Sequence, residues 1–144
     1  MNPPSSSKAP PAFLLLMLLV LVQGLSALHG GGSLILDPSG ARLQMSLRLL
    51  EGTPFPDYLV PGLVLFVLLG AYPLVILVGL WRRRAWAAAG AAVVGAGLVI
   101  WIAVQLLLVG RLSVLQPLFA VLGIMILSLA LSPQVRSFCR GTRT

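Results

Sequence analysis

Four long apolar runs alternate with short polar segments along the chain. The runs cover residues 12–29, 58–81, 85–109 and 113–132, and none of them contains Asp, Glu, Lys or Arg. At 1.5 Å per residue the last three are long enough to cross the roughly 30 Å hydrocarbon layer of a bilayer, and the first is barely so. This pattern predicts an all-α membrane protein in which four transmembrane helices form a bundle, with residues 1–144 as a single domain.

The first run has a second interpretation, as a cleavable signal peptide. Lys8 precedes its leucine-rich core and small residues lie near its end, as in secretory signals. Leu25 and Leu28 fit the cleavage pattern poorly, so we favour a retained helix over 12–29. The preceding residues 1–11 are rich in proline and serine, and we expect them to form a flexible tail.

The longest polar segment covers residues 30–57, and its pattern is not helical. Three glycines at 30–32 are expected to end the first helix. From 42 to 49 polar and apolar residues alternate at every step, which is the period of a β-strand with one buried face. Residues 37–40, Asp-Pro-Ser-Gly, match a type I turn. We therefore predict a β-hairpin-like loop between the first two helices, with an interfacial amphipathic helix over 41–50 as the alternative.

The composition supports a membrane protein and argues against a nucleic-acid partner. Hydrophobic residues make up 58% of the chain and charged residues 9%, against roughly 25% charged residues in soluble domains. The net charge of +7 comes from cations outside the apolar runs, which do not form the aromatic-interleaved basic surface that stacks bases. The expected partners are the lipid bilayer and either another membrane protein or a second copy of this chain. The single cysteine, Cys139, excludes an intrachain disulfide.

The distribution of Lys and Arg predicts the orientation. Lys8, the turn 82–84 and the tail 133–144 hold seven of the ten Lys and Arg residues, and the acids all lie in 30–57. Because cytoplasmic segments carry an excess of Lys and Arg, we expect both termini inside the cell. The loop 30–57 and the short turn 110–112 are then external, and the protein is a multi-pass component of the cell (inner) membrane.

The turn between the second and third runs has the composition of a topology anchor. Trp81 and Trp86 flank three consecutive cations, Arg82, Arg83 and Arg84. Tryptophan is enriched at headgroup depth, and clustered arginine marks a cytoplasmic connection. We expect these residues to have no further role.

Small residues recur along the third run. Ala87, Ala91 and Gly95 are spaced four apart, so they share one helix face. Such faces let helix backbones approach closely in lipid. The spacing is compatible with packing inside the bundle, which we favour, and with a homodimer seam.

Three glutamines are the notable polar residues within the apolar runs. Counted from the expected external helix ends, Gln23, Gln105 and Gln116 lie about 5 to 8 Å inside. We expect a shared polar layer that either fixes helix register or forms the floor of a pocket for a lipid headgroup or small ligand. Gln116 also stands at the end of a capping box that begins at Ser113.

Catalysis and ion coupling receive little support from the remaining polar residues. No titratable Asp, Glu, Lys or Arg occurs within the spans, which argues against a proton- or ion-coupled transporter. His29 borders the expected polar layer, but its spacing from the loop acids matches no metal motif. We expect no enzyme activity, metal or cofactor. The loop charges are instead candidate contacts for a partner: Asp37, Arg42, Arg48, Glu51 and Asp57.

Four short stretches carry a resemblance to known sequences. They are Leu-Ile-Leu-Asp-Pro-Ser-Gly at 34–40, Glu-Gly-Thr-Pro-Phe-Pro-Asp at 51–57, Val-Pro-Gly-Leu at 60–63 and Gln-Pro-Leu at 116–118. Together they resemble a family of small, uncharacterised four-helix membrane proteins of bacteria. The resemblance spans most of 31–131 and implies a bacterial cell membrane, with no activity, substrate or partner.

Two classes of function follow from these patterns. The first is a non-enzymatic accessory or assembly component that acts through the external loop and through helix packing. The alternative is a protein that binds or transports a lipid or small solute at a polar site near the outer helix ends. An enclosed polar cavity beside Gln105 would distinguish the second class from the first.

Overall fold

The computed structural model describes residues 8–111 and 113–141, and within these ranges the chain contains helices and turns but no strand. The helices are α1 (Pro11–Leu36), α2 (Leu59–Phe66), η3 (Val67–Ala71), α3 (Tyr72–Trp81), α4 (Ala85–Leu108), α5 (Leu115–Leu131) and α6 (Pro133–Arg140). Two short 3₁₀ helices, η1 (Ala41–Leu43) and η2 (Leu47–Leu50), lie in the connection between α1 and α2. The expected all-helical class is therefore confirmed.

Among the described residues, three helices are long and apolar enough to cross a membrane: Pro11–Leu36, Leu59–Trp81 and Ala85–Leu108. The second combines α2, η3 and α3. A fourth candidate is the pair α5 and α6, which is bent by 55° at Ser132. With 17 residues, α5 alone is about 25 Å long, slightly short of a full hydrocarbon layer.

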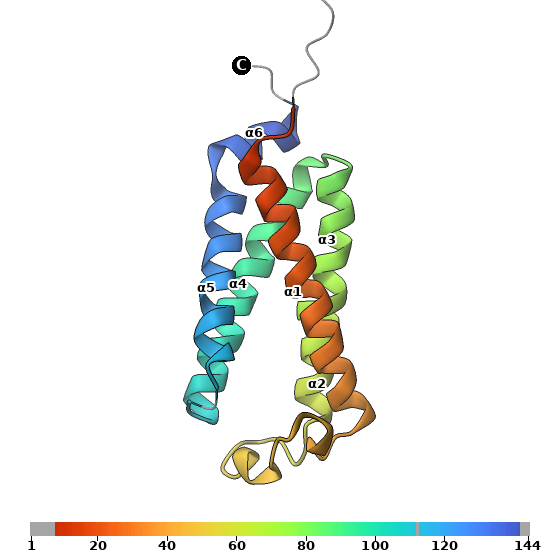
Figure 1. Ribbon diagram of the computed structural model, residues 1–144, viewed down its shortest axis with the longest axis vertical. Helices are drawn as coiled ribbons and strands as arrows, with labels where there is room; N and C mark the ends of the chain where they lie inside the picture. Colours follow the sequence, from red (N-terminus) through yellow and green to blue (C-terminus); the bar gives the residue numbers. More distant parts are fainter. Residues whose placement is uncertain (1–7, 112, 142–144) are drawn as a thin grey trace, which may run out of the picture.

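The helices form two hairpins that pack against each other (Figure 1). In the first hairpin α1 packs along α2, η3 and α3, and in the second α4 packs along α5. The hairpins meet through α3 against α4 and α1 against α5. Figure 1 shows them closest where α6 lies across the bundle and separating toward the α1–α2 connection. We call the end that carries the 82–84 turn and α6 the arginine end. The opposite end, at the α1–α2 connection, is the loop end.

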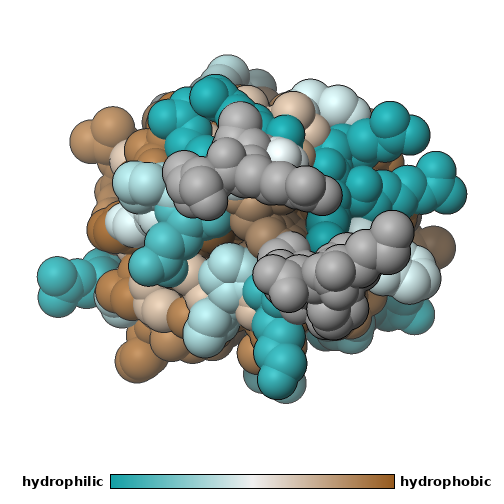
Figure 2. Space-filling model, turned by 90° about the horizontal axis from the view of Figure 1, so that it is seen from above, coloured by the Kyte–Doolittle hydropathy of each residue, from teal (hydrophilic) through white to brown (hydrophobic). Residues whose placement is uncertain are grey.

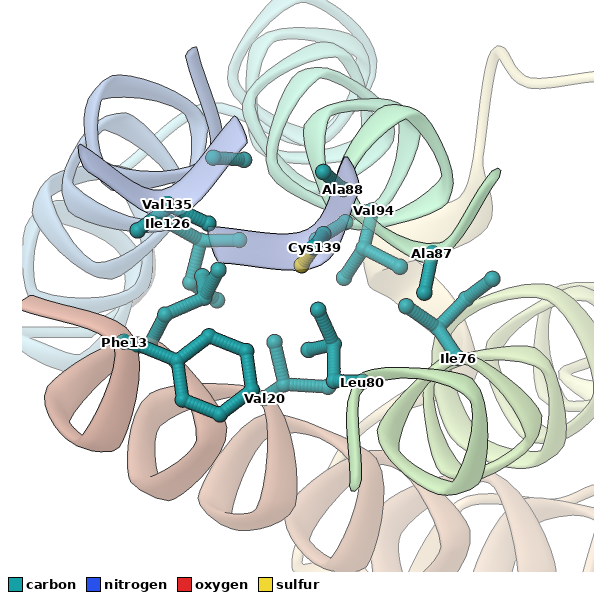
Figure 3. Packing of buried hydrophobic residues seen from close by; sticks show 13 residues of the cluster. Phe13, Val20, Ile76, Leu80, Ala87, Ala88, Val94, Ile126, Val135 and Cys139 are labelled. Atoms are coloured by element: carbon teal, nitrogen blue, oxygen red, sulfur yellow. The ribbon is translucent and has the colours of Figure 1, made fainter. Parts of the chain in front are cut away.

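The largest core cluster occupies the arginine end. Figure 3 shows side chains from α1, α3, α4, α5 and α6 converging there, among them Phe13, Leu80 and Ile126. Val135 and Cys139 of α6 are buried in the same cluster. The tail expected over 133–144 therefore begins with a helix that closes this end of the bundle.

Glycines bring the backbones of each hairpin into direct contact. A Cβ on Gly31 would lie 2.5 Å from the backbone nitrogen of Phe66 and 2.8 Å from the carbonyl oxygen of Gly62. In the second hairpin, a Cβ on Gly95 would lie 2.6 Å from the backbone nitrogen of Leu127 and 2.7 Å from the carbonyl oxygen of Gly123. Both contacts are too close for any side chain, and they are the small-residue packing that favours helix association in lipid.

The small-residue face of the third run lies inside the chain's own core. Ala87 and Ala91 are fully buried, and Gly95 packs on α5 as described above. A Cβ on Gly79 of α3 would lie 3.0 Å from the Cβ of Ala87. This face therefore contacts α3 and α5 of the same chain.

The predicted β-hairpin is wrong. The connection contains the two 3₁₀ helices η1 and η2. Two of the alternating apolar residues, Leu43 and Met45, pack with Leu34, Leu50 and Tyr58, whereas Leu47 is exposed. The turns bury these two side chains against Tyr58 without any strand pairing. An isolated two-stranded hairpin would be only marginally stable. The expected turn at 37–40 does form, with the Gly40 N–H donating to the Asp37 carbonyl at 3.1 Å.

The predicted end of the first helix at residue 30 is also wrong. Helix α1 continues through the three glycines to Leu36. Glycine lowers intrinsic helix stability by about 1 kcal/mol relative to alanine, but here Gly31 packs on α2 and the apolar residues that follow extend the buried face. Tertiary contact therefore overrides the local preference.

The three adjacent glycines provide a matched test of this contact. Gly31→Ala places a Cβ against the backbone of α2, and we expect it to lower the unfolding free energy by about 1–3 kcal/mol. Gly32→Ala is the control, because its Cβ would meet the Phe66 ring at an ordinary 3.6 Å. Unfolding in detergent, followed by circular dichroism, measures both. Equal stability of the two variants would contradict the proposed backbone contact.

Candidate functional site: the folded loop and an interior glutamine

The connection 37–57 folds around Tyr58, at the start of α2. Tyr58 is 3% exposed, its hydroxyl donates to the Ser46 carbonyl at 2.8 Å, and its N–H donates to the Pro38 carbonyl at 3.0 Å. Gly40 lies on the tyrosine ring with φ of +76°, where a Cβ would come within 2.8 Å of the ring. One buried side chain thus holds both halves of the loop to the bundle.

Asp37 organises the first half of the loop. One carboxylate oxygen accepts from the Ser39 hydroxyl at 2.5 Å and from the Ser39 N–H at 3.2 Å, and the other accepts from the Arg42 N–H at 2.9 Å. The hydrogen bond from the Ser39 side chain, followed by that from the Arg42 backbone, lowers the pKa of Asp37 below its ordinary 3.8. The carboxylate is therefore part of the folded loop in its ionised form.

The other loop charges face outward. Arg42, Arg48 and Glu51 are exposed, and Asp57 is partly exposed and accepts from the Leu59 N–H at 2.9 Å. Within 8–111 and 113–141, none of these side chains forms a salt bridge. The loop therefore presents charged groups of both signs on a surface that backbone and tyrosine hydrogen bonds have already shaped.

Gln23 lies inside the bundle, beside an irregularity in the second apolar helix. The π-helical turn η3 precedes Pro73, which has no N–H and so leaves the Leu69 carbonyl without its usual i+4 donor. The Gln23 side-chain amide donates to this carbonyl at 3.4 Å, and Gln23 is 1% exposed. Its Oε1 is buried and has no hydrogen-bond partner among the described residues.

The structure does not bring the three glutamines into one layer. Because α1 ends at Leu36, Gln23 lies about 20 Å from the loop end of that helix, near the middle of the bundle. The Gln116 amide is buried at the start of α5 and donates to the Gly110 carbonyl at 3.2 Å. Gln105 lies partly exposed near the end of α4. The three glutamines were expected at a common depth because the first helix was expected to end near residue 29, whereas it ends at Leu36.

His29 belongs to α1, whereas the acidic residues belong to the loop. His29 is exposed on α1, and its carbonyl accepts from the Ser33 hydroxyl at 2.8 Å. Across the described ranges, no three His, Cys, Asp or Glu residues come together in a way that would hold a metal ion. The acids Asp37, Glu51 and Asp57 belong to the loop surface described above.

The arginine end contains a contact that the sequence interpretation missed. The Arg83 guanidinium lies 4.4 Å from the centre of the Phe138 ring, and that ring meets Phe13 edge-on at 4.8 Å. Arg83 has φ of +51°, a left-handed conformation that costs a non-glycine residue about 1–2 kcal/mol. The cation–π contact helps to offset this cost and joins the 82–84 turn to α6.

The remaining topology-anchor residues are exposed at the arginine end. Figure 2, which looks onto this end, shows hydrophilic side chains gathered on the face and hydrophobic residues around its edge. Apolar residues at 135, 138 and 139 have helical spacing and follow a Ser-Pro helix start, so the sequence did carry a signal for α6. Exposed at this end are Trp81, Arg82, Arg84 and Trp86, together with Arg83 itself.

The lowered pKa of Asp37 makes the loop sensitive to acid. An aspartate with a lowered pKa contributes stability above its unfolded pKa of about 3.8, and that contribution is lost as the pH falls through the folded value. We expect the Arg42 amide NMR signal, recorded in detergent micelles, to titrate with a midpoint below 3.8. Asp37→Asn should remove this titration and Glu51→Gln should not. A midpoint above 3.8 would contradict the assigned hydrogen bonds.

Comparisons with known proteins assign no family to this chain. No family model, no curated protein and no solved structure matches it. The folded loop, the interior glutamine and the two ends of the bundle are therefore the basis for the proposals below.

Proposed function

We propose that this protein is a non-enzymatic multi-pass membrane protein that assembles with another membrane component through its folded loop, 37–57. In this proposal the arginine end faces the cytoplasm of the cell and the loop end faces outward, as the distribution of Lys and Arg favours. The bundle holds the loop at a fixed position outside the bilayer, and the partner binds there.

The observation that supports this proposal is that the loop is already folded. Hydrogen bonds from Tyr58 to residues 38 and 46 fix its course, and the Asp37 carboxylate fixes its first turn. A surface ordered in advance loses less conformational entropy when a partner binds. Arg42, Arg48 and Glu51 are exposed and make no salt bridge with the described residues, so a complementary partner would pair with charges that are free of internal partners.

A second candidate function is the binding of a small polar solute or a lipid headgroup within the bundle. One observation favours it: Gln23 Oε1 is a buried acceptor without a partner in the described part of the chain. A ligand with an N–H or O–H donor would satisfy that oxygen. The loop has more exposed charge and more defined geometry than this interior position, so we rank assembly first.

Photo-crosslinking from the loop in native membranes tests the first proposal. A photoreactive amino acid at Gln44 or Glu51, both exposed, should give a discrete protein adduct. The control position is Leu107, which is 85% exposed near the end of α4 and should give lipid adducts alone. Protease added outside intact cells should digest the loop adduct, which tests the orientation. Lipid-only adducts from both loop positions would refute assembly through the loop.

A further inference from the structure

An apolar groove runs along the outer surface of the first hairpin toward the arginine end. It has a volume of about 370 Å³, and its walls come from Met17, Leu18 and Leu21 of α1 and from Leu77, Val78 and Trp81 of α3. The groove is open to the outside along its length and is not an enclosed cavity. Every lining residue is apolar or aromatic, so the groove suits a hydrocarbon chain.

A cation stands at the end of this groove. Val78 lines the groove, and Arg82 is four residues further on, so the two side chains share one face of the helix end. Arg82 is exposed and makes no salt bridge within 8–111 and 113–141. Trp81 is itself a lining residue of the groove and directly precedes Arg82, and tryptophan is enriched between hydrocarbon and headgroups.

The surrounding charge is positive. The described part of the arginine end contains Lys8, the 82–84 turn and two arginines of α6, all exposed. All three acidic residues of the chain, Asp37, Glu51 and Asp57, belong to the loop at the opposite end. An anionic group at Arg82 would therefore meet complementary charge and no acidic neighbour. Arg83 is engaged with Phe138, and of the three arginines in the turn Arg82 is the one that follows the groove residue Val78 by four positions.

From these features we infer a binding site for one anionic phospholipid on the outside of the first hairpin. An acyl chain lies in the groove between α1 and α3, Trp81 packs beside the glycerol region, and Arg82 binds the headgroup phosphate. The site is distinct from the loop surface and does not depend on its function. A zwitterionic lipid fits the same groove but gains less from the positive field, so the site selects by charge.

Fluorescence quenching at Trp81 tests this site directly. The chain has three tryptophans, so a Trp86→Phe, Trp101→Phe protein reports from Trp81 alone. It is reconstituted in phosphatidylcholine vesicles that contain brominated phosphatidylglycerol or, in parallel, brominated phosphatidylcholine. Circular dichroism verifies that each variant retains its helical content. The measured quantity is the relative association of the two brominated lipids with Trp81.

We expect phosphatidylglycerol to associate about fivefold more strongly than phosphatidylcholine. This is the preference that the attraction between one cation and an anionic headgroup gives. Arg82→Gln should reduce this ratio, while the other cations of the arginine end keep it above one, and Arg82→Lys should retain the parent ratio. Arg111→Gln is the matched control, because it removes an exposed cation far from the groove and should leave the ratio unchanged. A ratio near one in the parent protein, an unchanged ratio in Arg82→Gln, or an equal loss in Arg111→Gln would overturn the proposal.

Discussion

Pro73 removes a backbone donor from the middle of the second apolar helix, and in a bilayer no water replaces it. An unsatisfied carbonyl in hydrocarbon costs several kcal/mol, so the chain must supply a donor from elsewhere. It does so with Gln23, whose amide reaches the Leu69 carbonyl. That reach requires α1 to lie close to the second helix. A Cβ on Gly24 would lie 3.3 Å from the Gly70 carbonyl oxygen, which shows how near the two backbones come.

The rest of the architecture follows from this close first hairpin. The Gly31 contact continues it toward the loop end, and α1 therefore extends to Leu36 before the chain turns. The loop then folds over the end of the hairpin on Tyr58. At the other end the same pair of helices forms the walls of the groove below Arg82. Both proposed interaction surfaces thus lie at the ends of one closely packed helix pair.

The apolar helices could be predicted from the sequence because length and hydropathy largely determine them. The loop could not, because its alternation of polar and apolar residues suits a strand as well as a set of turns. Only the burial of Tyr58 and the Asp37 hydrogen bonds distinguish the two. The sequence prediction placed the end of α1 too early for a related reason. Glycines at 30–32 favour a break locally, and the contact of Gly31 with α2 is invisible in the sequence.

The glutamines illustrate the same limit at the candidate site. Their positions near helix ends suggested a common depth, but the depth of Gln23 depends on where α1 ends. Pro73 and Gln23 were each visible in the sequence as unusual residues within an apolar run. Their pairing depends on which faces of α1 and the second helix meet, and the packing of glycines determines that. Similarly, the Arg83 contact with Phe138 joins residues far apart in the chain.

A double-mutant cycle between Gln23 and Pro73 measures whether the Gln23 amide compensates for the N–H that Pro73 lacks. Pro73→Ala restores the backbone N–H that the Leu69 carbonyl lacks, so this carbonyl no longer needs the Gln23 amide as a donor. We expect Gln23→Leu to lower the unfolding free energy more in the parent protein than in the Pro73→Ala background. The expected coupling is about 1 kcal/mol. The unpartnered Oε1 is removed in both halves of the cycle and cancels. Additive effects, with no coupling between the two substitutions, would show that the Gln23 amide does not compensate for the N–H that Pro73 lacks.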